Sequence, residues 1–273
     1  MYTKNHKEPK FPLLAAALFL IAASVFAGGK KAADNELKVG ASPVPHAELL
    51  ELIVEDLAKQ GITLRIIVFN DYVQPNQAVE DGELAANYFQ TIPYLEEFNK
   101  DRGFHLVNVG GIHIEPMALY SKKYKDLASI PQGATIAIPN DGSNENRALL
   151  LLQAGGLIKL QDTKGRGAVL SDIIENPRSI NFYEMDPPNL PRTLSDVDAA
   201  VINGNYAIDA GLSARNDGLV VEGSSSPYVN VVAVRAGSES RPEIIALVKA
   251  LQSEKIKNYI NNKWTKGEVL PVF

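Results

Sequence analysis

Short apolar runs alternate with amphipathic segments along most of the chain, and this alternation predicts an α/β fold. Residues 37–41 form the first apolar run, and the amphipathic segment over residues 46–60 predicts a helix that ends at Gly61. The same alternation then predicts strands over residues 63–69, 84–89 and 106–109, a short helix that begins at Pro75 and a longer helix over residues 94–102. Strands that alternate with helices in this way favour a mostly parallel, doubly wound sheet.

A second strand–helix series begins after residues 112–120, a long extended run that we interpret as a crossing into a second lobe. Residues 228–235 are extended again and are interpreted as the return crossing. We therefore expect an α/β protein of two doubly wound lobes joined by a two-crossing hinge, with a ligand cleft between the lobes. The predicted boundaries are residues 37–116 and 229–273 for lobe 1 and residues 117–228 for lobe 2.

Residues 135–154 carry the most informative local pattern. An apolar run ended by Pro139 predicts a buried strand, and the polar residues 140–144 lead into a helix that stops at Gly155. The free N–H groups at such a helix start favour an anion, and Arg147 in the first turn can hold a carboxylate through two parallel hydrogen bonds. A capped helix with a solvated arginine explains the same pattern, so the residues alone leave both interpretations open. A nucleotide site has less support, because G-x-x-x-x-G-K-[ST] is missing here.

The N-terminal segment has the pattern of an export signal. Lys4, Lys7 and Lys10 form a basic region, and residues 13–27 are apolar and uncharged. This apolar stretch is shorter than the roughly 20 residues of a membrane span, so we predict a signal peptide over residues 1–27. An uncleaved membrane anchor is the alternative. Residues 28–36 are predicted to be a flexible tether.

The composition of the chain excludes several classes of partner, cofactor and catalysis. The formal net charge is −5 and the sequence has no basic stripe, which argues against nucleic acid as a partner. The absence of cysteine excludes disulfides, Fe–S clusters, cysteine-ligated zinc and thiol catalysis. The four histidines show no metal-ligand spacing, so neither a metal nor a cofactor is expected. No nucleophile elbow and no Ser/His/Asp set stands out, although a secreted enzyme is kept as an alternative.

Six motifs in order resemble the substrate-binding lipoproteins of the methionine ABC importer. They are GASPVPHAELL, FNDYVQPNQAV, NYFQTIPYLEEFN, GIHIEPMALYSKK, IAIPNDGSNENRALLLL and DAAVINGNYAIDAGL, and the resemblance covers residues 37–273. It implies a type II periplasmic-binding-protein fold, no catalysis, and a monomer that delivers a small ligand to a permease in the cytoplasmic membrane. The protein would then lie outside the cytoplasm, in the periplasm or at the cell surface.

The same resemblance assigns site residues. It implies that Arg147 and Asn144 bind the α-carboxylate of the ligand and that Asn203 and Asn230 hold its polar end. Tyr72, Phe89, Tyr94 and His113 would line the side-chain pocket, and aromatic rings suit a thioether. Core packing for the aromatic residues and a turn at Asn203 are the alternatives that the residues by themselves leave open.

The sequence departs from the family pattern at three positions. Thr91 stands where a histidine is expected in the pocket, Ala85 stands where an acidic residue is expected, and Gly29 replaces the lipid-acceptor cysteine. L-methionine is the first ligand expected, because of the aromatic wall. The changes at Thr91 and Ala85 make a methionine-containing dipeptide the second. An adhesin or sensor with the same fold and no transport role is a third possibility.

Overall fold

The computed structural model describes Met1, residues 35–223 and residues 226–273. The predicted signal peptide, Gly29 and the tether as far as Asp34 lie outside these residues, apart from Met1. Residues 35–273 form one unit, which is described by itself below. Within the described residues, no helix is both long and apolar enough to cross a membrane.

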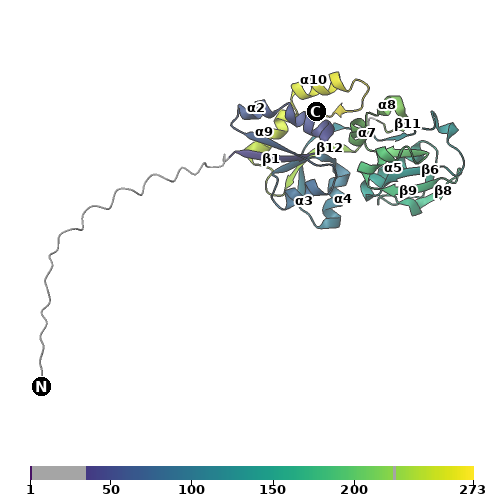
Figure 1. The fold of residues 1–273 in the computed structure, drawn as a ribbon, viewed down its shortest axis with the longest axis horizontal. Coiled ribbons are helices and arrows are strands. Elements are labelled where there is room, and N and C mark those ends of the chain that lie inside the picture. Colours follow the sequence, from purple (N-terminus) through teal and green to yellow (C-terminus); the bar gives the residue numbers. More distant parts are fainter. Residues whose placement is uncertain (2–34, 224–225) are drawn as a thin grey trace. The chain divides into compact units, whose positions relative to one another are not determined.

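The first sheet has six strands in the order β13-β4-β12-β3-β1-β2 (Figure 1). Strand β1 lies between β3 and the edge strand β2 and is parallel to both, whereas β12 runs antiparallel to β3 and β4. Its strands are β1 (Glu36–Ala41), β2 (Thr63–Val68), β3 (Ala86–Thr91), β4 (Leu106–Ile114), β12 (Val229–Arg235) and β13 (Leu270–Pro271).

Helices cover both faces of this sheet. On one face, Leu50 and Leu247 pack in the same buried cluster as Val39 of β1. On the other face, Val79 and Leu95 pack in a cluster with β12. The first face carries the irregular turn η1 (Pro43–Ala47) and the helices α1 (Glu48–Glu51), α2 (Val54–Ala58), α9 (Pro242–Leu251) and α10 (Glu254–Lys263), and the second carries α3 (Gln74–Glu80) and α4 (Ile92–Arg102).

The second sheet has five strands in the order β11-β5-β10-β6-β9. The strands are β5 (Ala118–Tyr120), β6 (Thr135–Pro139), β9 (Asn181–Met185), β10 (Ala199–Ile202) and β11 (Gly218–Val221). Leu149 and Leu152 of α5 (Gly142–Ala154) pack against one face of this sheet. The other face is covered by α6 (Leu190–Thr193), α7 (Gly204–Asp209) and α8 (Ala214–Asp217).

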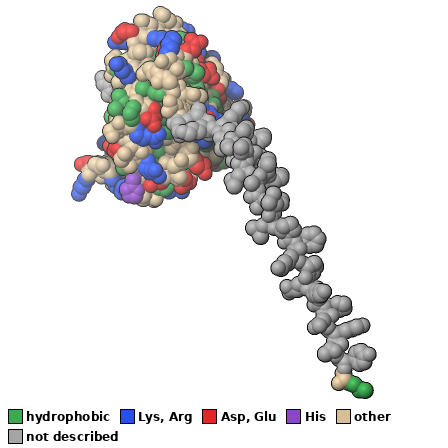
Figure 2. Space-filling view, turned by 90° about the vertical axis from the view of Figure 1, so that its left-hand side faces the viewer, with side chains coloured by type: hydrophobic (Ala, Val, Ile, Leu, Met, Phe, Trp, Pro, Cys, Tyr) green, Lys and Arg blue, Asp and Glu red, His purple; other side chains and the backbone are tan. Residues whose placement is uncertain are grey.

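Short elements complete the second half of the chain. They are the single turns η2 (Leu127–Ser129), η3 (Leu170–Asp172) and η4 (Pro187–Asn189), and the two-stranded ribbon of β7 (Lys159–Leu160) and β8 (Ile173–Glu175). In the face shown in Figure 2, acidic and basic side chains are intermixed, as is usual for a solvated surface.

The predicted α/β class is confirmed, but the mostly parallel arrangement is wrong, because β12 and β13 in the first sheet and β5 in the second pair antiparallel with their neighbours. Three predicted boundaries are also corrected. The helix predicted over residues 46–60 is interrupted because the N–H of Ile53 bonds to the carbonyl of Leu50, only three residues back, over 3.1 Å. The strand predicted over residues 84–89 begins at Ala86, because the N–H of Leu84 bonds to Ala78 O and closes α3. Residues 106–114 form one continuous strand.

The second extended run, interpreted as a return crossing, is itself a strand within the residues that the predicted boundaries assign to lobe 1. Residues 229–235 are strand β12, a full member of the first sheet, paired with both β3 and β4. The second sheet ends with β11 at Val221, so the chain changes sheet between these two strands. Every strand of the second sheet lies between residues 118 and 221. The division into two separately moving lobes stays a prediction.

Candidate functional site

One cavity, with about 320 Å³ of empty space, lies among residues from both sheets. Eight of the nine predicted site residues line it: Tyr72, Phe89, Thr91, Tyr94, Asn144, Arg147, Asn203 and Asn230. Gln90, Glu115, Gly204 and Asn205 complete the lining.

The strand and helix ends explain why these side chains meet. Phe89 and Thr91 lie at the carboxyl end of β3, and Tyr94 lies in the first turn of α4 directly after it. Arg147 lies in the second turn of α5, not in the first turn as predicted, and the N-terminus of α5 is capped because the carboxylate of Asp141 accepts the N–H of Asn144 over 3.0 Å. Asn203 precedes the first residue of α7. Carboxyl ends of strands in open α/β sheets are the usual place for a ligand.

Aromatic side chains form one wall. The ring of Tyr72 lies 5.8 Å from Phe89 and 5.7 Å from Tyr94, measured between centroids. The hydroxyl of Tyr72 donates to Oδ1 of Asn205 over 2.6 Å, and that of Tyr94 donates to the carbonyl of Tyr72 over 3.0 Å. Because both hydroxyls have protein partners, this wall offers mainly apolar ring surface to a ligand.

His113 is the predicted site residue that does not line the cavity. It lies behind Glu115, fully buried, with Nε2 only 2.6 Å from Oε1 of that carboxylate. Its other ring nitrogen, Nδ1, contacts the hydroxyl of Tyr88 at 2.5 Å. Both ring nitrogens of His113 therefore have protein partners. His113 does not form part of the pocket wall as predicted, but supports Glu115, which does.

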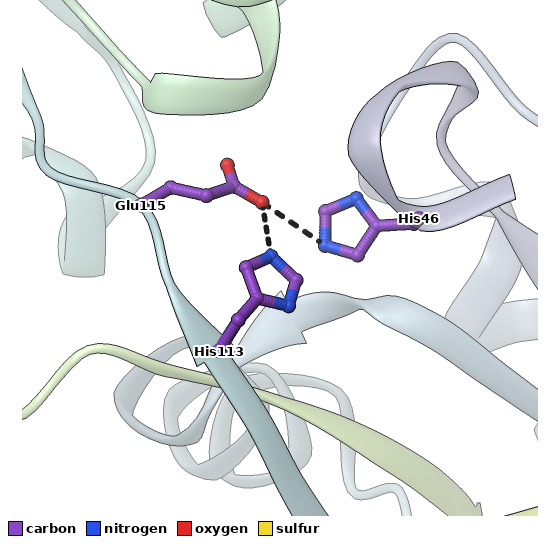
Figure 3. Close-up of side chains that lie close together, drawn as sticks. All are labelled: His46, His113 and Glu115. Carbon is purple, nitrogen blue, oxygen red and sulfur yellow. Dashed lines mark hydrogen bonds and ion pairs between the residues drawn. The ribbon is translucent and has the colours of Figure 1, made fainter. Parts of the chain in front are cut away.

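Two imidazoles converge on the carboxylate of Glu115 (Figure 3). His46 places Nε2 at 3.3 Å from Oε1 of Glu115 and at 3.0 Å from Oδ1 of Asn230. The hydroxyl of Ser42 lies 2.6 Å from Nδ1 of His46. We assign both histidines as neutral Nε2–H tautomers, because the hydroxyls of Ser42 and Tyr88 can then donate to Nδ1, while Nε2–H of His113 donates to Glu115 and Nε2–H of His46 donates to Oδ1 of Asn230.

Electrostatics agrees with this assignment. Burial lowers the pKa of His46 to about 4, against the opposing effect of Glu115, and lowers the pKa of His113 to about 3. Burial also raises the pKa of Glu115, whereas His46, Arg147 and the N–H of Asn205 oppose that rise. Figure 3 shows one oxygen of Glu115 facing the imidazoles and the other turned away from them. The result is a buried carboxylate at the cavity wall, fixed by neutral donors.

This trio also has metal-ligand residue types, since two imidazoles and a carboxylate lie within 4.8 Å of one another. Ligands on one tetrahedral zinc, at about 2.0–2.1 Å from the ion, stay more than 3 Å apart. The 2.6 Å between His113 and Glu115 is a hydrogen-bond distance, and both Nδ1 atoms already have hydroxyl donors. The arrangement fits a hydrogen-bonded support for Glu115 better than a metal site.

Arg147 has several partners within the protein. Its Nε donates to Oε1 of Glu222 over 3.0 Å, and Nη2 donates to Oε2 of Glu222 over 2.5 Å and to the carbonyl of Glu115 over 2.8 Å. The guanidinium also lies over the ring of Tyr228, 4.3 Å from its centroid. The solvated-arginine interpretation is therefore wrong, because this side chain is buried.

Some polar atoms around the cavity have no partner among the described residues. Thr91 Oγ1 and Asn203 Oδ1 are both buried and unpaired. The amide nitrogen of Asn203 donates to Oδ1 of Asn144 over 2.7 Å, so its oxygen is held at the cavity. A buried polar group without a partner costs about 1–3 kcal/mol, which a ligand with complementary groups would recover.

Sequence reasoning missed Glu115, Glu222 and Asn205. A charged residue inside the apolar run over residues 112–120 was the available signal for Glu115. Gly204 had a local signal as well, because Asn-Gly marks a turn, but here it begins α7. A Cβ on Gly204 would lie 2.5 Å from Cβ of Glu115, so the glycine is needed for the close approach of α7 to that residue.

Comparison with known proteins agrees with this architecture. The chain matches the family model described as NlpA lipoprotein over residues 37–273. It is 45% identical to membrane lipoprotein TpN32 of Treponema pallidum over 238 residues, which are 87% of this chain and 89% of that protein. It is 40% identical to the methionine-binding lipoprotein MetQ of Bacillus subtilis, over 95% of this chain and 98% of that one.

A solved structure gives the same picture. The nutrient-binding protein of Burkholderia cenocepacia, whose structure was determined bound to methionine, is 47% identical and superposes with a TM-score of 0.82. The match covers 87% of this chain and 100% of that chain. Likeness at this level of identity confirms the predicted periplasmic-binding-protein fold and the resemblance on which that prediction rested.

Proposed function

The chain belongs to the NlpA lipoprotein family, and on this premise we propose that it is an extracytoplasmic substrate-binding protein that captures L-methionine for an ABC importer. Relatives named as methionine-binding lipoproteins and a neighbour bound to methionine support this ligand. In this role the protein performs no catalysis, and its partner is a permease in the cytoplasmic membrane. It acts as a monomer outside the cytoplasm.

One observation carries the proposal. Arg147 and Glu115, a guanidinium and a buried carboxyl, both line the cavity, and they are in contact because Nη2 of Arg147 donates to the backbone carbonyl of Glu115 over 2.8 Å. A free amino acid carries a carboxylate and an ammonium on one carbon, and these two groups are opposite in charge to the guanidinium and the carboxylate at the cavity. A charged residue pair of this kind selects a zwitterion over a sugar or a hydrocarbon.

The remaining lining groups receive definite roles. The carboxylate of Glu115 and Oδ1 of Asn203 accept from the ligand ammonium. Asn230 uses its oxygen on His46, which leaves its amide nitrogen to donate to the ligand carboxylate beside Arg147. Asn144 contacts Asp141 and Asn203 with its amide, so it acts by orienting Asn203. The ligand side chain lies against Tyr72, Phe89 and Tyr94.

Methionine suits this wall because thioether–aromatic contacts are worth about 0.3–1.5 kcal/mol. A methionine-containing dipeptide remains the second candidate, favoured by the space that Thr91 leaves where the family pattern has a histidine. A dipeptide separates its ammonium and carboxylate by a peptide unit, so only one of them could occupy the Glu115–Arg147 position.

A thermal-shift screen of ligand-stripped protein tests the proposal. The screen covers the amino acids, methionyl dipeptides and sugars. A ligand present at 100 times its Kd should add about 2.7 kcal/mol to the free energy of unfolding. We expect the largest shift with L-methionine. A larger shift with a dipeptide reverses the order of the two ligands, and a shift with a sugar alone rejects the proposal.

A further inference from the structure

Two residues that do not line the cavity bind the guanidinium of Arg147. Glu222 accepts from Nε and Nη2, and the ring of Tyr228 lies against the guanidinium face. The cavity is lined by Arg147 but by neither Glu222 nor Tyr228. Tyr228 is itself held, because Nδ2 of Asn146 donates to its hydroxyl over 3.3 Å. These partners therefore hold the arginine from behind rather than competing for the space of a ligand.

Glu222 is anchored as firmly as the arginine it binds. Its carboxylate also accepts the N–H of Met117 over 3.3 Å, and its own N–H donates to the carbonyl of Met117 over 2.9 Å. Met117 is fully buried and directly precedes β5. The carboxylate of Glu222 therefore accepts three hydrogen bonds, two from Arg147 and one from Met117, and its backbone is bonded to Met117 as well. These bonds hold the carboxylate in one orientation, so Glu222 fixes one edge of the guanidinium.

The opposite edge of the guanidinium remains available. A guanidinium has five N–H groups, and Nε together with both hydrogens of Nη2 are used. No described residue accepts a hydrogen bond from Nη1. Because Arg147 lines the cavity while Glu222 and Tyr228 do not, we assign the Nη1 edge to the ligand.

The charged side chains around the Arg147 guanidinium do not favour a ligand of net negative charge. Arg147 contributes one positive charge, and Glu222 neutralises it at hydrogen-bond distance. Glu115 adds a second carboxylate, which lies beside the neutral imidazoles of His113 and His46. With Glu115 ionised, these three side chains sum to one net negative charge before a ligand enters, and a ligand of net negative charge is then repelled in a site of low dielectric constant.

We propose that Glu222 is a positioning and specificity-determining residue, which turns the Nη1 edge of Arg147 toward the ligand and neutralises its charge, so that the cavity accepts zwitterions and rejects ligands of net negative charge. The proposal rests on the proposed function, because it assigns the ligand carboxylate to Arg147. It predicts that removal of the Glu222 charge changes which ligand charge the site prefers, beyond any general weakening of binding.

A ligand series with one side chain and three charges tests this directly. Methioninamide is a cation, methionine a zwitterion and N-formylmethionine an anion. Calorimetry gives the Kd of each ligand for the wild-type protein and for Glu222→Gln. We expect the ratio of the N-formylmethionine Kd to the methionine Kd to fall on the order of tenfold in Glu222→Gln, and the ratio of methioninamide to methionine to rise by about the same factor.

Two further variants separate charge from position. Glu222→Asp keeps the charge and shortens the reach, so it should weaken all three ligands by about tenfold and leave their ratios unchanged. Glu175→Gln removes a carboxylate from an exposed ion pair with Lys159 and should change neither affinities nor ratios. If Glu222→Gln does not fold, the Asp variant decides, and wild-type affinities in that variant overturn the proposal.

Arg147→Lys in the same series separates this proposal from the proposed function. If the wild-type protein does not bind methionine, or if Arg147→Lys binds it as tightly as the wild type, the assignment of the ligand carboxylate fails. If methionine binding depends on Arg147 but Glu222→Gln weakens all three ligands by one common factor, Glu222 has a structural role only and this inference alone is rejected.

Discussion

The hydroxyl of Tyr72 donates a hydrogen bond to Oδ1 of Asn205 over 2.6 Å, and this bond joins the two halves of the cavity wall. Tyr72 follows β2 of the first sheet, and Asn205 lies in α7, which packs on the second sheet. A direct bond between the two halves stabilises the arrangement in which the cavity is enclosed.

Tyr72→Phe should therefore weaken ligand binding while the aromatic wall stays in place. The change leaves Oδ1 of Asn205 without its donor, which costs about 1–3 kcal/mol if the enclosed form persists. Calorimetry with L-methionine measures the loss. Tyr183→Phe is the control, because this tyrosine is exposed and removed from the cavity. Equal affinities of Tyr72→Phe and the wild-type protein would show that the bond does not contribute to closure.

Local signals allowed the sequence to predict the parts of the site that lie within one strand–helix unit. The strand ended by Pro139, the cap at Asp141 and the buried Arg147 follow one another within a few residues, and the structure has them as β6 and α5. Their chemistry depends on capping and helix geometry, which are properties of neighbouring residues. The motif resemblance then identified eight residues, distant from one another in the chain, that the structure places around one cavity.

Partners far apart in the chain could not be predicted. Arg147 and Glu222 are separated by 75 positions, and neither residue type by itself specifies the other. The same holds for His46 and Glu115, since four histidines without metal spacing gave no reason to pair one of them with a carboxylate. The pattern of residues 229–235 does not distinguish a connection from a central strand such as β12, because an extended run looks alike in both.

Gly204→Ala should disturb the Glu115 support. The added Cβ would meet Cβ of Glu115 at 2.5 Å, which real structures do not tolerate without a shift of α7 or of the carboxylate. We expect a loss of about 1–3 kcal/mol in the free energy of unfolding, together with weaker methionine binding. Gly167→Ala is the matched control, because its Cβ would meet no atom closer than 3.5 Å. Denaturant titration and calorimetry report the two effects, and indistinguishable behaviour of the two variants would contradict this account.

Stability should fall as the solution is acidified below neutral pH. Burial holds the pKa of His46 at about 4 and that of His113 at about 3, whereas histidines in the unfolded chain titrate near about 6.5. Their neutral folded forms therefore contribute stability that is complete above pH of about 6.5 and is lost as the pH falls toward about 4. The raised pKa of Glu115 acts in the opposite direction, because it lowers stability as the pH rises. We expect the two histidines to outweigh this single carboxyl, so stability falls on acidification.

Thermal unfolding of ligand-free protein between pH 7 and pH 4 measures this effect. His46→Asn should reduce the dependence of the melting temperature on pH, because one of the two neutral imidazoles is gone. His105→Asn serves as the control, since the side chain of His105 is exposed. A melting temperature that stays constant over this interval would show that the buried histidines do not titrate as the geometry requires.

Gly29 should determine how the protein is retained at the membrane. It stands where the resemblance implies a lipid-acceptor cysteine, after a segment with the pattern of a signal peptide. We expect the protein to be released soluble after cleavage near Ala27, and Gly29→Cys to become acylated and to remain with the membrane. Fractionation and mass spectrometry of the N-terminus decide this. Recovery of the unchanged protein in the membrane with residues 1–27 still attached would identify that segment as the anchor.

The central claim is that this cavity binds free methionine through Arg147. Calorimetric titration of ligand-stripped protein with L-methionine, run in parallel on the wild type and on Arg147→Ala, tests it most directly. The account predicts one methionine per chain for the wild type and an affinity loss of about 2–5 kcal/mol for the variant, because a charge-assisted partner of the ligand carboxylate disappears from a buried site. Absence of binding heat in the wild-type protein, or equal affinity in both proteins, would contradict it.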